Sequence, residues 1–145
     1  MRGLPAEVGL IETLRVENGV CELLALHQAR LRQSAADLHI QTDETRLWQD
    51  LQAACASEWA EGVWRVKCSI AADGSHDWQA APLAALAGAQ SVCIAEAVLP
   101  KHDVLRRYKT QVREQLDAVW QQAAEQGAFD GLLFNTNGEL LEGGR

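Results

Sequence analysis

Apolar and polar residues alternate along the N-terminal third of the chain in ways that predict both strands and helices. Residues 8–16 are rich in β-branched and apolar types. The Asn18-Gly19 pair that follows is a strong hairpin signal before the apolar run 20–26, so we expect a β-hairpin here. Between His27 and His39 the apolar residues recur at helical spacing, which predicts an amphipathic helix.

A second helix and a strand pair are expected next. The helix begins at Thr42 or Asp43, because either side chain can accept hydrogen bonds from the first-turn amides, and it runs to about Trp59. Residues 63–70 then alternate between apolar and polar types, which is typical of a half-buried strand. A return strand is expected around residues 76–79.

The order of the predicted elements indicates an α+β fold with antiparallel hairpins packed against helices. We expect an N-terminal two-layer domain over residues 1–98, a linker over 99–108, and the beginning of a larger, barrel-like domain over 109–145. The further elements expected are a strand at 91–98, a helix over 110–126, and strands at 129–134 and 139–142 joined by an Asn-Gly turn.

Composition and charge narrow the classes of partner. The chain is 48% hydrophobic and 23% charged, and no apolar run approaches the ~18 residues that a membrane helix needs. Its net charge of -7 argues against a nucleic-acid partner. Residues 1–5 do not resemble a secretory signal, so we expect a cytoplasmic protein. The four cysteines and four histidines lack metal-site spacing, which predicts free thiols and no metal.

Three motifs occur in an order that resembles a known enzyme family. They are His27-x-x-Arg30-Leu31, Arg107-Tyr108-Lys109-Thr110 and Gly138-Glu139-x-x-Glu142. Together they are similar to the fold-type IV, pyridoxal-phosphate-dependent enzymes, which include the class IV aminotransferases and aminodeoxychorismate lyase. The second motif, with Phe129-Asp130 after it, most resembles the lyase, including lyase domains fused to the aminobenzoate synthase component.

The resemblance implies a role for each of three residues. Lys109 would bond covalently to pyridoxal phosphate, Arg30 would bind the phosphate group, and Glu142 would face the pyridine nitrogen. A lysine must be neutral to attack an aldehyde, and the neighbouring Arg106 and Arg107 disfavour its charged form. A guanidinium can bind phosphate through two hydrogen bonds, and a carboxylate keeps the pyridine nitrogen protonated.

Each of these residues also has an ordinary structural interpretation. Lys109 could be a solvated residue of a basic linker, and Arg30 an exposed helix arginine like Arg32. Glu142 could be a charged residue near a strand end, a role that Glu139 would fill equally well. We interpret His27 as an interaction at the start of the helix rather than as a cofactor ligand.

The resemblance implies conversion of 4-amino-4-deoxychorismate to 4-aminobenzoate and pyruvate, a step of folate biosynthesis, by a homodimer. It leaves two alternatives open. A class IV aminotransferase acting on branched-chain or D-amino acids would use the same Lys109. A truncated, catalytically weak homologue is the other, because family members normally continue beyond the position of Arg145. Association or fusion with an aminobenzoate synthase component is a further expectation.

Overall fold

The computed structural model describes residues 8–145, so the N-terminal stretch in which no secretory signal is predicted lies outside the described residues. The described chain forms two compact units. Unit 1 contains the residues up to Ala84 together with 107–111, and unit 2 contains 85–106 and 112–145. Each unit has its own sheet and its own apolar core.

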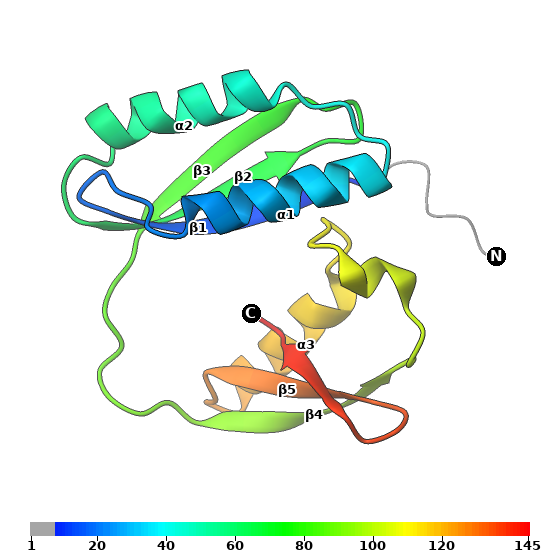
Figure 1. The fold of residues 1–145 in the computed structure, drawn as a ribbon. Coiled ribbons are helices and arrows are strands. Elements are labelled where there is room, and N and C mark those ends of the chain that lie inside the picture. Colours follow the sequence, from blue (N-terminus) through cyan, green and yellow to red (C-terminus); the bar gives the residue numbers. More distant parts are fainter. Residues whose placement is uncertain (1–7) are drawn as a thin grey trace. The chain divides into compact units, whose positions relative to one another are not determined.

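Unit 1 is a three-stranded antiparallel sheet with two helices on one face (Figure 1). The strand order is β1-β2-β3, so β1 lies at an edge. Its elements are β1 (Leu10–Glu17), α1 (Leu24–Asp37), α2 (Glu44–Ser57), β2 (Val63–Ile70) and β3 (His76–Pro82).

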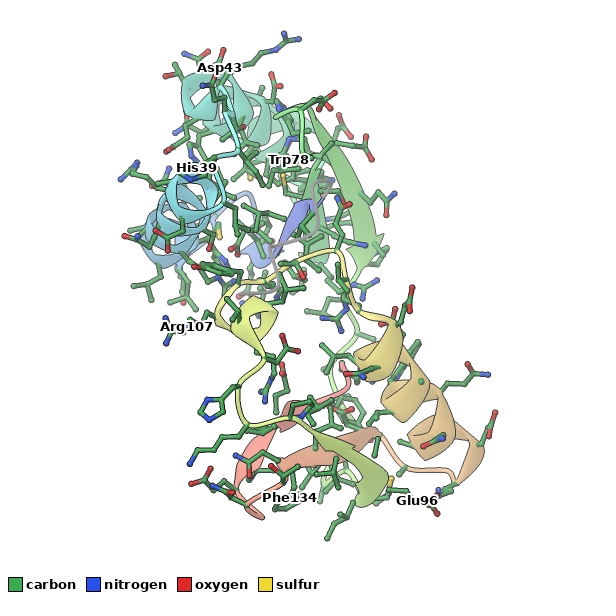
Figure 2. The ribbon with its side chains drawn as sticks, turned by 90° about the vertical axis from the view of Figure 1, so that its right-hand side faces the viewer. His39, Asp43, Trp78, Glu96, Arg107 and Phe134 are labelled. Carbon is green, nitrogen blue, oxygen red and sulfur yellow. The ribbon has the colours of Figure 1, made fainter. Side chains whose placement is uncertain are left out.

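The core of unit 1 lies between the sheet and the helices. Alternate residues of the strands face the helices, as the two-residue period of a strand requires. Asp43 caps α2 by accepting a hydrogen bond from the amide of Arg46 at 3.0 Å. The ring centroids of Trp78 on β3 and Trp48 on α2 lie 6.4 Å apart; Figure 2 labels Asp43 and Trp78. The central buried side chains are Leu10, Leu14, Val16, Leu31, Leu47, Leu51, Val66, Cys68 and Ile70.

Unit 2 combines a parallel and an antiparallel strand pair. β5 pairs in parallel with β4 and antiparallel with β6, and α3 packs on the sheet through Val119 and Leu133. A Cβ on Gly131 would lie 2.6 Å from a methyl group of Val119, so glycine permits this close approach. The elements are β4 (Val92–Leu99), the 3-10 helix η1 (Val104–Arg107), α3 (Glu114–Glu125), β5 (Asp130–Asn135) and β6 (Leu140–Gly143).

The structure confirms the α+β class and most of the expected elements. The strand predicted at 63–70 is β2, with Val66, Cys68 and Ile70 buried as the alternation indicates. The four cysteines are free thiols. Within residues 8–145, the longest helices are too short and too polar to cross a bilayer.

The expected hairpin at Asn18-Gly19 is wrong. The turn forms, but only Glu17 and Val20 pair across it, and the apolar run after it enters α1 at Leu24. β1 instead takes β2 as its partner, which covers all eight of its residues. Which strand β1 pairs with depends on tertiary packing, and a two-residue turn signal does not specify that partner.

Unit 2 also differs from the expected arrangement. The sequence predicts antiparallel hairpins and an N-terminal domain that extends to residue 98, whereas β4 pairs in parallel with β5 through an α3 crossover. Parallel strands need such a crossover, and the pairing places β4 in unit 2 rather than with β1, β2 and β3. The chain therefore leaves unit 1 after Ala84 and returns to it only for residues 107–111.

Candidate functional site

A buried carboxylate on β1 anchors the arginine of the His-x-x-Arg motif. Glu12 is only 2% exposed. Its carboxylate accepts hydrogen bonds from Nε of Arg30 at 2.8 Å and from Nη2 of the same guanidinium. Nδ1 of His27 lies 2.7 Å from Oε2 of Glu12, the same oxygen that accepts from Nη2 of Arg30. One carboxylate thus engages both polar residues of the motif.

The spacing of His27 and Arg30 follows from the helix. Residues three apart lie on the same face of an α-helix, so both side chains of α1 reach the one carboxylate on β1. A buried charge is costly unless it is paired and hydrogen-bonded, and these contacts meet that requirement for Glu12. The hydrogen bond to Glu12 also raises the pKa of Arg30, against an opposing effect of desolvation.

Arg30 remains accessible in spite of this pairing. Its side chain is 46% exposed, and Glu12 engages Nε and Nη2. A guanidinium carries five N–H donors in a fixed fork, so Nη1 can still donate to an anion outside the protein. Glu12 thus orients the guanidinium of Arg30 on one side, while the other side of the guanidinium faces solvent.

Lys109 is held by its backbone along the free edge of β1. The amide of Ile11 donates to the carbonyl oxygen of Lys109 at 2.8 Å, and the amide of Gln111 donates to the carbonyl oxygen of Gly9 at 2.9 Å. Between these bonds, Thr110 pairs with Leu10 in an antiparallel bridge. The side chain of Lys109 is half-buried. The alternative interpretation of Lys109, as a solvated residue of a basic linker, does not describe this environment.

β1 therefore connects two of the three predicted residues within unit 1. Ile11 bonds the backbone of Lys109, and the next residue, Glu12, bonds the side chain of Arg30. Residues 107–111 are separated from the rest of unit 1 by more than twenty residues of sequence, yet they pack with it. The strand fixes the backbone of Lys109 and the guanidinium of Arg30 relative to one another.

Glu142 lies on β6 in unit 2 and is paired with Arg106. Nη2 and Nε of Arg106 donate to Oε1 of Glu142 at 2.8 and 3.2 Å. The Glu142 side chain is 41% exposed, and Arg106 is 22% exposed. Because both hydrogen bonds end on Oε1, Oε2 can still accept a proton donor. Glu139 takes a different part, since its Oε2 accepts from the side-chain amide of Asn135 at 2.6 Å.

This pairing changes the electrostatic argument for Lys109. From the sequence, Arg106 and Arg107 are expected to disfavour the charged form of the neighbouring Lys109. Arg106 instead has its charge balanced by Glu142 at salt-bridge distance. Arg107 is exposed, where solvent screens its charge. The neighbouring arginines thus give weaker support for a neutral Lys109 than the sequence indicates.

Glu12 is the residue of this arrangement to which sequence reasoning assigns no role. The signal for it is present, because Glu12 occupies a core-facing position between Leu10 and Leu14 in an otherwise apolar row. A charged residue at such a position is rarely buried without a partner. The pattern alone does not identify that partner, which lies on another element.

Known proteins resemble this chain over most of its described length. A putative amino-acid aminotransferase from Mesorhizobium loti is 29% identical over 94% of this chain, with a TM-score of 0.85. A putative 4-amino-4-deoxychorismate lyase is 27% identical over 94%, with a TM-score of 0.80. A hypothetical aminotransferase from Mycobacterium tuberculosis, solved in a PLP-bound form, is 23% identical over 94%, with a TM-score of 0.76, and shows the fold alone.

The chain is shorter than these neighbours. It spans 67% of the first structure, 57% of the second and 55% of the third. No curated protein matches it. The family described as Amino-transferase class IV, however, matches residues 9–145. Since this match takes in nearly the whole sequence, the chain belongs to the class IV aminotransferase family.

Proposed function

We propose that this chain uses pyridoxal phosphate and acts as a lyase that converts 4-amino-4-deoxychorismate to 4-aminobenzoate and pyruvate. The observation that carries the proposal is the family match over residues 9–145, which includes all three residues predicted to hold the cofactor. The likeness at 27% identity to a putative 4-amino-4-deoxychorismate lyase supports the choice of reaction.

The chemistry of the side chains fits this cofactor. Arg30 presents a guanidinium, fixed on one side by Glu12, that suits a phosphate group. Lys109 supplies an amine on a backbone held by β1. Glu142 supplies a carboxylate whose Oε2 suits a protonated ring nitrogen. A cation, an amine and a carboxylate are the three groups that phosphate, aldehyde and pyridinium require.

Each residue has a distinct task in the proposed reaction. Bound pyridoxal phosphate supplies an electron sink for the carbon that bears the substrate nitrogen. Arg30 binds and orients the phosphate, and Glu142 holds a proton at the ring nitrogen. Lys109 anchors the cofactor and, once displaced by the substrate amine, acts as the general base at its Nζ atom.

The lyase reaction balances without another reactant. Lys109 removes the proton from the carbon that bears nitrogen, and the bond between the ring and the enolpyruvyl oxygen breaks. The enolpyruvate that leaves takes up one proton at its methylene carbon and becomes pyruvate. The remaining ring becomes aromatic as 4-aminobenzoate, which supplies much of the driving force. The amine nitrogen stays with the ring throughout.

An aminotransferase acting on branched-chain or D-amino acids is the second candidate. It is favoured by the likeness at 29% identity to the Mesorhizobium loti protein, which is described as a putative amino-acid aminotransferase. Lys109 would then move a proton between two carbons instead of only removing one, and the nitrogen would pass to a 2-oxo acid. A catalytically weak homologue is the third candidate.

The first experiment tests the cofactor and its lysine. We expect the purified chain with added pyridoxal phosphate to absorb near ~410 nm, as a lysine-bound cofactor does, and borohydride to fix the cofactor to the peptide that contains Lys109. Lys109→Ala should lose both signals. Lys101→Ala, which changes an exposed lysine, is the matched control and should keep them. Equal labelling of all three proteins would contradict the assignment.

A second experiment separates the two reactions. The loaded chain is given aminodeoxychorismate in one assay and an amino acid with 2-oxoglutarate in another. Release of pyruvate with 4-aminobenzoate in the first supports the lyase, and formation of glutamate in the second supports the aminotransferase. A loaded chain that is inactive in both assays supports the weak homologue.

We also propose that the chain is a cytoplasmic homodimer, in contact or fused with an aminobenzoate synthase component in its native setting. Exposed apolar side chains of β4 in unit 2 support self-association, since Ile94 is 71% exposed and Val98 54%. Light scattering should give twice the chain mass. A monomer at high protein concentration would contradict the dimer.

A further inference from the structure

A cavity in unit 1 brings together two thiols from different elements. Its volume is about 340 Å³, and it opens where the segment before α1 meets α2. Cys21 lies on that segment and Cys55 on α2, and both line the cavity. Apolar walls are supplied by Leu24, Leu51, Ala56 and Ala60. None of the residues proposed to hold pyridoxal phosphate lines it.

The segment that carries Cys21 is fixed against the turn that follows α2. The amide of Asn18 donates to the carbonyl oxygen of Gly62 at 2.8 Å, and the amide of Gly19 donates to that of Trp59 at 2.9 Å. A Cβ on Gly19 would lie 2.9 Å from the carbonyl oxygen of Cys55. The backbone two residues before Cys21 therefore packs closely against the backbone of Cys55, and both cysteines line the same cavity.

The two thiols are neutral at ordinary pH. Burial raises the pKa of Cys21, and it also raises the pKa of Cys55, which the neighbouring Cys21 raises further. Thiols of this kind are poor nucleophiles, so a reactive or redox cysteine is not the natural interpretation. A soft metal ion, in contrast, displaces thiol protons as it binds.

We propose that Cys21 and Cys55 form a two-coordinate site for a soft, thiophilic, monovalent metal ion of the Cu(I) class. Two sulfur–metal bonds form, two S–H bonds break, and both protons pass to solvent with no change of oxidation state. Within residues 8–145, no group of three or more His, Cys, Asp or Glu side chains could hold a metal. Two thiolates that line one cavity suit Cu(I) better than zinc, which takes four ligands.

The test is an anaerobic titration of the reduced chain with Cu(I) in competition with the coloured chelator bicinchoninate. We expect one tightly bound Cu(I) per chain. Cys21→Ser and Cys55→Ser should each weaken binding by roughly 100-fold or more, because the second bond of a chelate forms at high effective concentration. Cys93→Ser, which changes a half-buried thiol of unit 2, is the matched control and should leave the affinity unchanged.

The pH dependence gives a second measurement. Release of two protons makes the apparent dissociation constant fall about 100-fold per pH unit near neutrality, whereas one thiol gives about tenfold. A tenfold dependence, or an unchanged affinity in Cys21→Ser, would overturn the proposal. Cys55 is buried, so circular dichroism checks the fold of its variants. If these do not fold, Cys21→Ser and the pH dependence decide the matter.

Discussion

Glu12 and Arg30 form a two-point hydrogen-bonded pair in which the carboxylate is 2% exposed and the guanidinium side chain 46% exposed. The buried partner is the one that loses most if the pair is broken. Arg30 can be solvated by water, whereas the Glu12 carboxylate would be left in the core with His27 alone. The residue proposed to bind phosphate is therefore also part of the fold of unit 1.

Arg30→Ala should destabilise the chain even when no cofactor is present. We expect the free energy of unfolding to fall by about 1–3 kcal/mol, because a buried acceptor loses its charged donor. Urea unfolding of the cofactor-free chain measures this. Arg32→Ala is the matched control, since Arg32 is 65% exposed and pairs with the surface residue Glu44, and it should cost less than about 1 kcal/mol. Equal losses in the two variants would contradict the structural role of Arg30.

The predictable parts of the fold are those whose signals are local. The alternation at residues 63–70 defines β2 to the residue, and the Thr42-Asp43 pair indicates the start of α2, where Asp43 proves to be the cap. Both depend only on period and on the first-turn amides. The parallel pairing of β4 with β5 is not local, because it joins residues more than thirty positions apart in the sequence.

The candidate residues show the same division. Motif resemblance predicts cofactor roles for Arg30, Lys109 and Glu142. It does not reveal that Glu12 holds Arg30 or that Arg106 holds Glu142. Each of these pairs joins residues on separate elements. The physical signal for Glu12 is a charge in an apolar row, whereas Arg106 in a basic segment has no comparable signal.

Glu142→Gln should separate cofactor binding from turnover. The variant is expected to keep the cofactor absorption, because Lys109 and Arg30 are unchanged, and to lose roughly 100-fold in turnover, the usual cost of one electrostatic stabiliser. Glu139→Gln is the control, since Glu139 bonds Asn135 within the turn before β6. Spectra and pyruvate-release rates are compared on the same samples. A larger loss in Glu139→Gln would assign the role to that residue instead.

Arg106→Ala should reduce turnover less than Glu142→Gln does. The carboxylate would remain but would lose the two hydrogen bonds that orient it, at 2.8 and 3.2 Å. Arg106→Lys keeps the charge without the fork and should recover part of the activity. If Arg106→Ala abolishes the cofactor absorption, Arg106 acts on the cofactor site as a whole rather than through Glu142.

Gly19→Ala should be more damaging than the same change at Gly127. Both glycines have left-handed backbones, with φ of 78° and 73°, so each substitution costs about 1–2 kcal/mol in backbone strain. Only at Gly19 does the new methyl group meet an obstacle, the carbonyl oxygen of Cys55 at 2.9 Å, while nothing lies within 4 Å at Gly127. Thermal melts of the two variants measure the difference. Equal melting temperatures would mean that the segment moves away from α2 without cost.

Cys68 should make the chain lose stability in alkali. Burial, together with the charges of Glu12 and Asp77, raises the pKa of this thiol from 9.0 to about 12. Below pH 9 the thiol is protonated in both states, so the stabilisation is fully present. Between pH 9 and about 12 only the unfolded state releases the proton, and the free energy of unfolding falls by up to about 1.4 kcal/mol per pH unit.

The variant Cys68→Ala tests this slope rather than the absolute stability. Removing a fully buried side chain lowers the free energy of unfolding at every pH. Between pH 9 and 12, however, this free energy should fall less steeply with pH than in the parent, because one fewer proton is released on unfolding. Urea unfolding at several pH values gives the slope, with Cys93→Ala as the half-buried control. Parallel slopes for Cys68→Ala and the parent would show that the thiol opens to solvent before the chain unfolds, which the 0% exposure of Cys68 argues against.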